Sequence, residues 1–427
     1  MKKNFILFLF FVKIIFCNDQ IPAKKQIKPI AIINGTVFTA NEIIEKGTIT
    51  FRNGKIEFVG KNFSLTSEYE IIDASGKHIY PGLFSSITTL GLNEVQALRA
   101  THDNVEGGKF NPNLKTEVAV YTESELIPVT RFNGITTVNV LPQSGIISGS
   151  IATVNLDGWT YEDMLVKSMS AMVLNFPSMK INTAWWETRS EEDQKKENEK
   201  SVNELQIFFK DAKAYFVAKK NNSLQKYDAK FDAMINVFEK KVPLLVWAFD
   251  ILQIQSAVAF AEEYDVRIII AGGNDSWRIA NLLKEKQIPV VANMTHRLPD
   301  RNWEQYNEPF LLPKKLYENG IQFCFSADEG GDGNYRNLPY QVGTAIAHGL
   351  PKDIALKSIT LFPAQIFGVD NRIGSLEIGK DANLIIVNGD IFDIRSNVEM
   401  EFIDGKKIDL TSHQTMLYEK YKKRYEK

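Results

Sequence analysis

The chain has 427 residues, which is long enough for a complete eight-stranded α/β barrel with a second, smaller domain and a large buried core. Apolar residues make up 44% of it and charged residues 24%, as in an ordinary globular protein. The formal net charge is −2, which excludes the basic surplus typical of nucleic-acid-binding proteins. No nucleic-acid partner is therefore predicted.

The first residues have the pattern of a secretion signal. Lys2 and Lys3 precede an apolar run over residues 5–12, which matches the charged and apolar regions of a signal peptide. We therefore expect residues 1–18 to be removed and the mature protein to be periplasmic or secreted. Lipid anchoring at Cys17 is less favoured than simple cleavage, because a bulky phenylalanine precedes the cysteine. No transmembrane segment is predicted, because no stretch approaches the roughly 20 apolar residues that a membrane-spanning helix needs.

Both ends of the chain have the pattern of short β-strands. Residues 28–80 contain hairpin signals, notably Asn53-Gly54, a dipeptide that favours two-residue turns. A matching set of apolar strands occupies residues 370–412. Neither set has enough strands to bury one face by itself, so we expect the two sets to form one composite β-sandwich domain. Residues 413–427 are predicted to form a charged C-terminal tail.

Residues 81–369, between these ends, alternate short apolar runs with amphipathic stretches, the pattern of a parallel sheet wrapped by helices. The eight predicted strands, which suit an α/β barrel, are residues 79–86, 135–141, 151–156, 171–174, 243–249, 266–271, 289–294 and 321–327. Residues 178–240 are rich in lysine and glutamate and carry an apolar stripe at helical spacing. They are predicted to be a helical insertion in the barrel.

Two junctions carry a resemblance to a known family. A Tyr-Pro-Gly-Leu run over residues 80–83 enters the barrel, and a Gly-Ser-Leu-Glu-Ile-Gly-Lys-Asp-Ala run within residues 372–384 leaves it. Together they resemble the amidohydrolase superfamily, most closely its imidazolonepropionase-like secreted members, over about residues 28–409. The resemblance implies a (β/α)8 barrel of the TIM type with a β-sandwich. It also implies descent from a metal-dependent hydrolase of non-peptide C–N bonds of the cyclic-amide type.

The resemblance also places the family's metal ligands on this sequence. Counted from the Pro-Gly turn, the two histidines of the first strand fall on Ile87 and Thr89, and the later histidines fall on Trp247 and Gly272. The aspartate after the eighth strand remains as Asp328, and in the family it binds metal and moves a proton. Catalytic zinc sites generally use three protein ligands. We therefore predict that this chemistry is impaired or lost; a divalent metal of the zinc type is expected only if the site still functions.

Three interpretations stay open. The first is a catalytically dead barrel that acts as a binding or partner subunit beside an active amidohydrolase relative; Asp328 then caps a loop or pairs with Arg336. The second is a hydrolase with an atypical metal site at the barrel mouth, built from His102, His296 and Asp328. The third is a protein that binds a small-molecule ligand with Trp247 as a stacking platform. A neighbouring gene for an intact relative favours the first, stoichiometric metal the second, and a bound small molecule without turnover the third.

Overall fold

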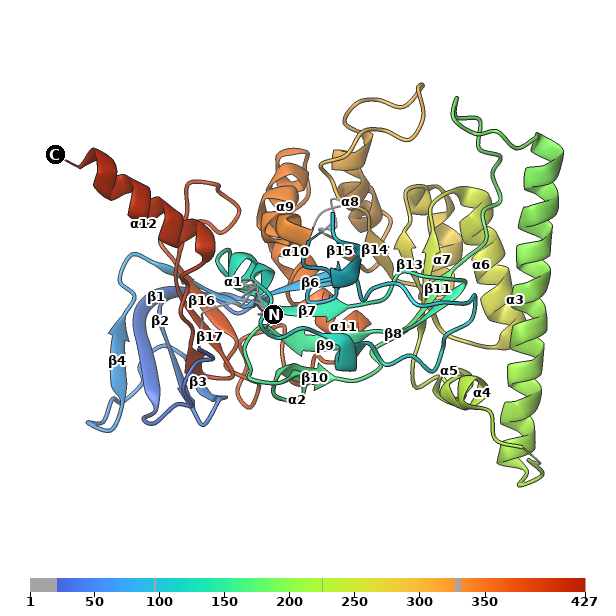
Figure 1. The fold of residues 1–427 in the computed structure, drawn as a ribbon. Helices are drawn as coiled ribbons and strands as arrows, with labels where there is room; N and C mark the ends of the chain where they lie inside the picture. The colour runs from blue at the N-terminus through green and yellow to red at the C-terminus, as the bar shows by residue number, and fades with distance from the viewer. Residues whose placement is uncertain (1–20, 96, 225, 327–331, 427) are drawn as a thin grey trace, which may run out of the picture.

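The computed structural model describes residues 21–95, 97–224, 226–326 and 332–426. Figure 1 shows a β-rich unit, built from the two ends of the chain, beside a larger unit in which helices surround strands. Helix α12 (His413–Tyr425) extends from the β-rich unit, and the long helix α3 (Glu191–Lys220) lies on the opposite flank. Residues 1–18, which are the predicted signal peptide with Cys17, lie outside the described residues, and so does Asp328.

The β-rich unit is one eight-stranded sheet. Its strands, in spatial order, are β18 (Lys406–Lys407), β17 (Val398–Ile403), β16 (Leu384–Val387), β5 (His78–Pro81), β1 (Ile30–Phe38), β2 (Ile43–Arg52) and β3 (Lys55–Gly60), with β4 (Glu70–Asp73) paired to β1. The two ends of the chain meet where β5 and β16 pair antiparallel along their full length. Buried side chains such as Ile32, Phe51 and Phe402 give this sheet a core of its own. Strands from both ends of the chain therefore complete one core.

The larger unit contains two further sheets. One has the spatial order β10 (Leu165–Lys167), β9 (Ala152–Asn155), β7 (Ile135–Val140) and β6 (Leu83–Thr88); the other has the order β15 (Phe323–Phe325), β14 (Val290–Ala292), β13 (Ile268–Gly272), β12 (Leu244–Ala248), β11 (Met172–Asn175) and β8 (Ile147–Ser150). Strands β11 to β15 are parallel to one another, and β6 is parallel to β7. Strand β15 also contacts β6, although no hydrogen-bonded ladder joins them within the described residues.

The two sheets are linked through β8 and β9, which are separated only by Ile151. Strand β8 pairs antiparallel with β11, and β9 pairs antiparallel with β7. The prediction of a strand over residues 151–156 is confirmed, but its assignment to a parallel sheet is wrong. The reason is chain length: residues 141–151 connect β7 to its partner β9, whereas a crossover between parallel strands needs a dozen residues or more, usually with a helix.

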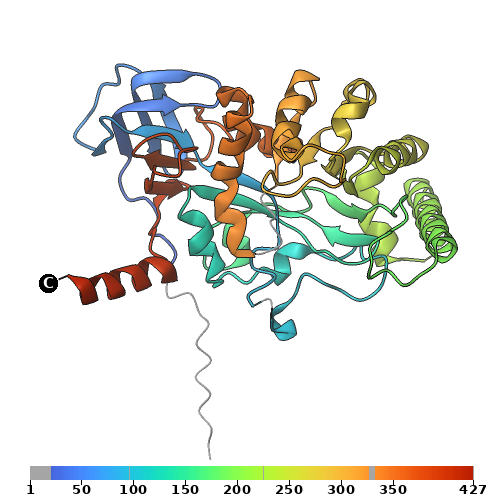
Figure 2. The same ribbon diagram turned by 90° about the horizontal axis from the view of Figure 1, so that it is seen from above.

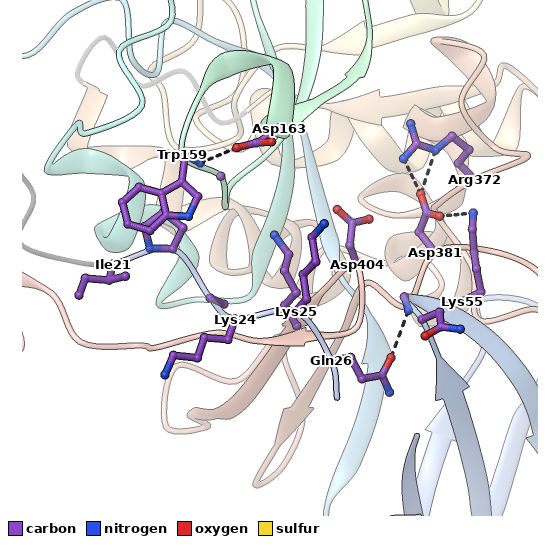
Figure 3. Close-up of a pocket in the computed structure, with 16 residues that line it drawn as sticks. Ile21, Lys24, Lys25, Gln26, Lys55, Trp159, Asp163, Arg372, Asp381 and Asp404 are labelled. Carbon is purple, nitrogen blue, oxygen red and sulfur yellow. Dashed lines mark hydrogen bonds and ion pairs between the residues drawn. The ribbon is translucent and has the colours of Figure 1, made fainter. Parts of the chain in front are cut away.

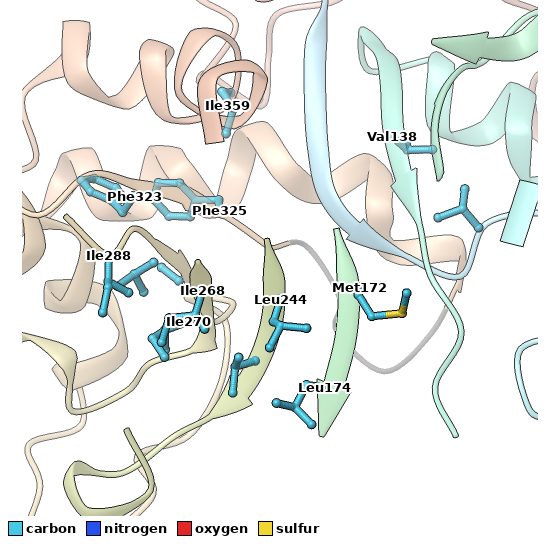
Figure 4. Close-up of a cluster of buried hydrophobic side chains, with 14 of the residues drawn as sticks. Val138, Met172, Leu174, Leu244, Ile268, Ile270, Ile288, Phe323, Phe325 and Ile359 are labelled. Atoms are coloured by element: carbon cyan, nitrogen blue, oxygen red, sulfur yellow. The ribbon is translucent and has the colours of Figure 1, made fainter. Parts of the chain in front are cut away.

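Alternate side chains of the parallel strands pack on opposite faces, as the two-residue period of a strand requires. Leu245 and Ile269 point into the interior that the barrel strands surround, and they belong to one cluster there with the buried Cys324. Leu244 and Ile268 belong instead to the large cluster beneath the helices (Figure 4). The larger unit therefore has a packed interior as well as a packed outer layer.

Helices form the outer layer of the larger unit (Figure 2). They are α1 (Leu126–Arg131), α2 (Tyr161–Met164), α6 (Ile251–Tyr264), α7 (Ala280–Glu285), α8 (Glu308–Glu318), α9 (Leu338–Ala347), α10 (Lys352–Ser358) and α11 (Leu361–Ile366). Short 3-10 helices lie at Arg99–Thr101, Thr116–Ala119, Ser276–Ile279 and Asp332–Asn337. Among the described helices, none combines the length and the apolar character needed to cross a membrane.

The predicted insertion, residues 178–240, contains α3, α4 (Ala229–Ala233) and α5 (Ile235–Phe238). Helix α3 begins after Ser190, whose side chain accepts a hydrogen bond from the Asp193 N–H group. Its buried apolar stripe includes Phe209, whose ring packs edge-on against Tyr264 of α6 at a centroid distance of 5.2 Å. This contact anchors the long helix to the barrel wall.

A buried carboxyl group lies where the β-rich unit meets the barrel. Glu401 of β17 is 0% exposed, and neither of its carboxyl oxygens has a hydrogen-bond partner among the described residues. Burial raises the pKa of Glu401 well above its ordinary range; nearby Arg131 opposes the rise and Asp157 adds to it. The folded protein therefore keeps a proton on Glu401 at pH values where the unfolded chain loses it.

Replacing this group by the neutral Glu401→Gln should make the free energy of unfolding less dependent on pH. The folded pKa is raised above the ordinary value of 4.5, so between these two values the folded state binds more protons than the unfolded state. Wild-type stability therefore falls as the pH rises through that window, by up to about 1.4 kcal/mol per pH unit. Urea unfolding at pH 5.5 and pH 8 measures the difference, with the exposed Glu70→Gln as the control. An equal pH dependence in wild type and Glu401→Gln would contradict the buried proton.

Candidate functional site

The carboxyl ends of the parallel strands meet at one end of the barrel, which we call the barrel mouth. Thr89 follows β6, Trp247 and Phe249 lie at the end of β12, Gly272 ends β13, and Asn293 follows β14. In α/β barrels, active sites are built from residues at this end, whereas the opposite end serves stability. The barrel mouth is therefore the candidate functional site.

On the first strand, the side chains of the two residues singled out from the sequence, Ile87 and Thr89, are both buried. Ile87 is 0% exposed and belongs to the interior cluster with Phe84. Thr89 is held by Tyr335, which is 1% exposed. The Thr89 N–H group donates to the Tyr335 hydroxyl oxygen at 2.8 Å, and the two hydroxyl oxygens lie 3.0 Å apart. The Thr89 hydroxyl is therefore engaged in a buried polar contact.

At the end of the fifth predicted strand, an aromatic pair lies at the mouth. The ring of Trp247 stacks on that of Phe249 with a centroid distance of 5.9 Å and an interplanar angle of 25°. A Cβ atom built on Gly272 would lie 2.6 Å from the Phe249 ring, and the backbone there has φ of +88°. Both the contact and the backbone conformation disfavour any side chain at Gly272.

The two histidines of the predicted replacement site lie on different loops. Nε2 of His102, which is half-buried, lies 3.1 Å from the Val95 carbonyl oxygen. Nε2 of His296, which is exposed, lies 2.8 Å from Oγ1 of Thr344. A site that joins both histidines to Asp328 stays a prediction, because Asp328 is outside the part of the chain that the structure describes.

Known proteins share this sequence and this architecture. The sequence model of the amidohydrolase family matches residues 310–408. A segment of 92 residues is 27% identical to the amidohydrolase tasK of Hapsidospora irregularis, and it covers 22% of this chain but only 9% of that longer protein. The crystal structure of an amidohydrolase from Thermotoga maritima MSB8 superposes with a TM-score of 0.77 and 25% identity over 89% of this chain and 99% of that one. The chain belongs to the amidohydrolase superfamily.

More distant structures share the fold. Molinate hydrolase has a TM-score of 0.56 and 13% identity over 92% of this chain and 96% of its own. The β-aspartyl dipeptidase of Fervidobacterium islandicum AW-1 has a TM-score of 0.53 and 16% identity over 89% and 96%. The predicted fold class, a TIM-type barrel with a smaller β domain from both chain ends, is confirmed by the likeness to the Thermotoga maritima amidohydrolase. The strands of the smaller domain form one eight-stranded sheet.

The described residues do not fit the metal of this superfamily. Ile87, Trp247 and Gly272 offer no metal ligand, and Thr89 offers only a neutral hydroxyl that is already bonded to Tyr335. Within the described ranges, no group of three or more His, Cys, Asp or Glu side chains is arranged to hold a metal ion. No step through a metal follows from these residues.

Sequence reasoning missed several residues of the mouth. Phe249 lies two positions after Trp247, and side chains two apart on a strand share a face, so that signal was available. Asn175 is the register partner of Trp247 on the neighbouring strand. Its Nδ2 atom donates to the Gly145 carbonyl oxygen at 2.8 Å and lies 3.0 Å from Oγ of Ser148. Contacts of this kind depend on the pairing of distant segments.

The contact between Phe249 and Gly272 can be measured by a double-mutant cycle. Gly272→Ala should lower the free energy of unfolding by about 2–4 kcal/mol, because the new methyl group meets the Phe249 ring and the backbone is strained for alanine. In a Phe249→Ala background the ring is gone, so the same change should cost less by about 1–3 kcal/mol. Urea denaturation of the four proteins gives the coupling energy. Equal costs in both backgrounds would show that the ring does not fill this position.

Proposed function

We propose that this member of the amidohydrolase superfamily binds a small, flat cyclic amide at the barrel mouth and no longer performs the metal-dependent hydrolysis of its relatives. The observation that carries the proposal is the stacking of Trp247 on Phe249 at the end of β12. The family resemblance assigns the Trp247 position to a metal ligand. The reaction that the resemblance implies for the ancestor is the hydrolysis of non-peptide C–N bonds in cyclic amides. We therefore propose that the protein still binds a ligand of the cyclic-amide class but does not hydrolyse it.

Stacking is the first part of this recognition. Trp247 is partly exposed, and Phe249 is 39% exposed. On one side of Trp247 the register partner is Asn175, and on the other it is Ala271, a small residue. A flat ring can therefore lie against the indole face without meeting a bulky side chain from β13. Aromatic contacts of this geometry stabilise a complex by about 0.5–1.5 kcal/mol beyond the area that they bury.

Hydrogen bonds are the second part. The Nδ2 atom of Asn175 is taken up by Gly145 and Ser148, so a ligand uses its Oδ1 atom as the acceptor. The other amide at the mouth is Asn293, whose Nδ2 atom lies 3.4 Å from Oδ1 of Asn274. A cyclic amide presents N–H donors and C=O acceptors at its edge, which match the amide groups at the mouth.

The residues on the first strand have a supporting role in this proposal. The Thr89–Tyr335 contact and the packing of Ile87 fix the floor of the mouth, and they supply neither a general base nor an activated water. The proposal also includes export of the mature protein to the periplasm or the medium, supported by the lysines and the apolar run at the start of the sequence.

Hydantoin, a flat ring with two amide groups, is the probe that tests this function. It should bind the mature protein, as measured by saturation-transfer NMR and titration, and it should be recovered unhydrolysed. Trp247→Ala should weaken binding about fivefold or more, because the stacking surface is removed. Tyr425→Ala, which removes an exposed aromatic side chain of helix α12 away from the barrel mouth, is the matched control and should leave the affinity unchanged.

Two results would contradict the proposed function. Hydantoin opened to the linear product at a rate above that of buffer would show that the mouth is catalytic. Binding that survives Trp247→Ala unchanged would show that the aromatic pair is not the platform.

A further inference from the structure

A second cavity lies at the junction of the β-rich unit and the barrel, and we call it the junction cavity. Its volume is about 830 Å³, within the range of small-molecule sites. Segments distant in the sequence line it: the stretch at residues 21–26, the β2–β3 turn, the loop after β9, the connection from the barrel to β16, and the β17–β18 turn. Figure 3 shows Trp159 and Ile21 on one side and Arg372, Asp381 and Lys55 on the other.

The junction cavity is distinct from the barrel mouth. Strand β9 runs antiparallel to β7, and Asn155 at its end pairs with Thr137 near the start of β7. Trp159 therefore lies beyond the amino ends of the parallel strands, whereas the mouth lies at their carboxyl ends. A ligand in the junction cavity does not belong to the site proposed above, and this inference does not depend on the proposed function.

Hydrogen bonds hold the wall formed by residues 21–26 in place. The Ala23 N–H group donates to Oδ1 of Asp157 at 3.1 Å. Nε2 of Gln26 donates to the Phe51 carbonyl oxygen at 2.8 Å, and Oε1 of Gln26 accepts from the Gly54 N–H group at 3.1 Å. This stretch is therefore joined both to the barrel and to the β-rich unit, and the cavity between them is a built feature.

Some of the charged side chains that line the junction cavity form ion pairs with described residues, and others do not. The buried Asp381 is neutralised by Arg372, at 2.8 Å, and by Lys55. Lys406 is neutralised by Asp157, at 2.5 Å. Lys25, in contrast, forms no ion pair with any described residue, and it stands between the Trp159 side and Asp404 in Figure 3. A positive charge without a partner therefore faces the cavity.

Asp404 lies on the same wall of the cavity. Its Oδ2 atom accepts a hydrogen bond from Nδ2 of Asn155 at 3.1 Å. Burial and the nearby Asp381 raise its pKa, and the hydrogen bond from Asn155 opposes the rise.

The indole of Trp159 supplies an apolar surface beside these polar groups. The side chain is 66% exposed, although its backbone is held by a hydrogen bond from its N–H group to Oδ2 of Asp163 at 3.2 Å. A large aromatic residue fixed at its backbone and open at its ring is a ready stacking surface, since ordering it costs little conformational entropy.

We propose that the junction cavity binds a small anion attached to a flat ring, with the ring against Trp159 and the anionic group beside Lys25. The ligand class is an aromatic carboxylate, which matches a cation and an indole face placed within one cavity.

The probes for this site are 2-naphthoate and its neutral analogue 2-naphthamide, titrated against the mature protein and followed by saturation-transfer NMR. The protein should bind 2-naphthoate more tightly than the amide. Trp159→Ala should weaken binding of both probes about five- to tenfold, because the stacking surface is lost. Lys25→Gln should weaken 2-naphthoate about threefold and leave the amide unchanged, which removes the preference for the charged probe.

Two control variants separate this site from others. Lys61→Gln removes an exposed lysine that lies outside the cavity, and it should change neither affinity. Trp247→Ala removes the platform at the barrel mouth and should also change neither. The proposal is overturned if the amide binds as tightly as the acid in wild type, if Lys25→Gln keeps the preference for the acid, or if Trp247→Ala rather than Trp159→Ala abolishes binding.

Discussion

The antiparallel pairing of β8 with β11 and of β9 with β7 determines the position of both sites. Strand β8 pairs with β11 and strand β9 with β7, so this stretch joins the two sheets of the barrel. At its start, Gly145 and Ser148 hold Asn175 at the mouth. Beyond its end, Asp157 and Trp159 line or border the junction cavity. The same stretch crosses the barrel from one end to the other. The register of its strand pairing therefore determines which of its residues lie at each end.

Hydrogen bonds join several polar groups inside the barrel. Oγ1 of Thr153 donates to Oδ1 of Asn139 at 2.6 Å, and Nδ2 of Asn139 donates to the Ser86 carbonyl oxygen at 3.1 Å. Above this layer, Tyr335 holds Thr89, and Phe249 covers Gly272. In many metalloproteins the metal itself stabilises the fold. Here, packing and hydrogen bonds hold the strand ends.

Much of the fold could be predicted from the sequence, because it depends on local patterns. Apolar runs bounded by turn residues identified the strands, and the junction motifs identified the superfamily. The assignment of Ile87 and Trp247 to former ligand positions, which rests on counting along single strands, stays a prediction. The predicted domain boundaries and the signal peptide stay predictions.

The remaining features of the fold and of the two sites could not be predicted, because they depend on contacts between distant segments. The direction of residues 151–156 is set by their partners β7 and β10. Tyr335 meets Thr89 across 246 positions in the chain, and no pattern near either residue signals that contact. The junction cavity assembles residues from near position 21 to beyond position 400. Propensity and periodicity describe neighbours in sequence, whereas these features arise only when the chain is folded.

The central claim is that the barrel mouth has exchanged metal ligands for packed aromatic side chains. Elemental analysis tests it most directly, on mature protein purified without chelator and without a histidine tag, beside an Asp328→Ala variant. The account predicts zinc, iron and manganese well below one atom per chain in both proteins. A near-stoichiometric metal in the wild type that is lost in Asp328→Ala would contradict it, and would establish a metal site built around Asp328.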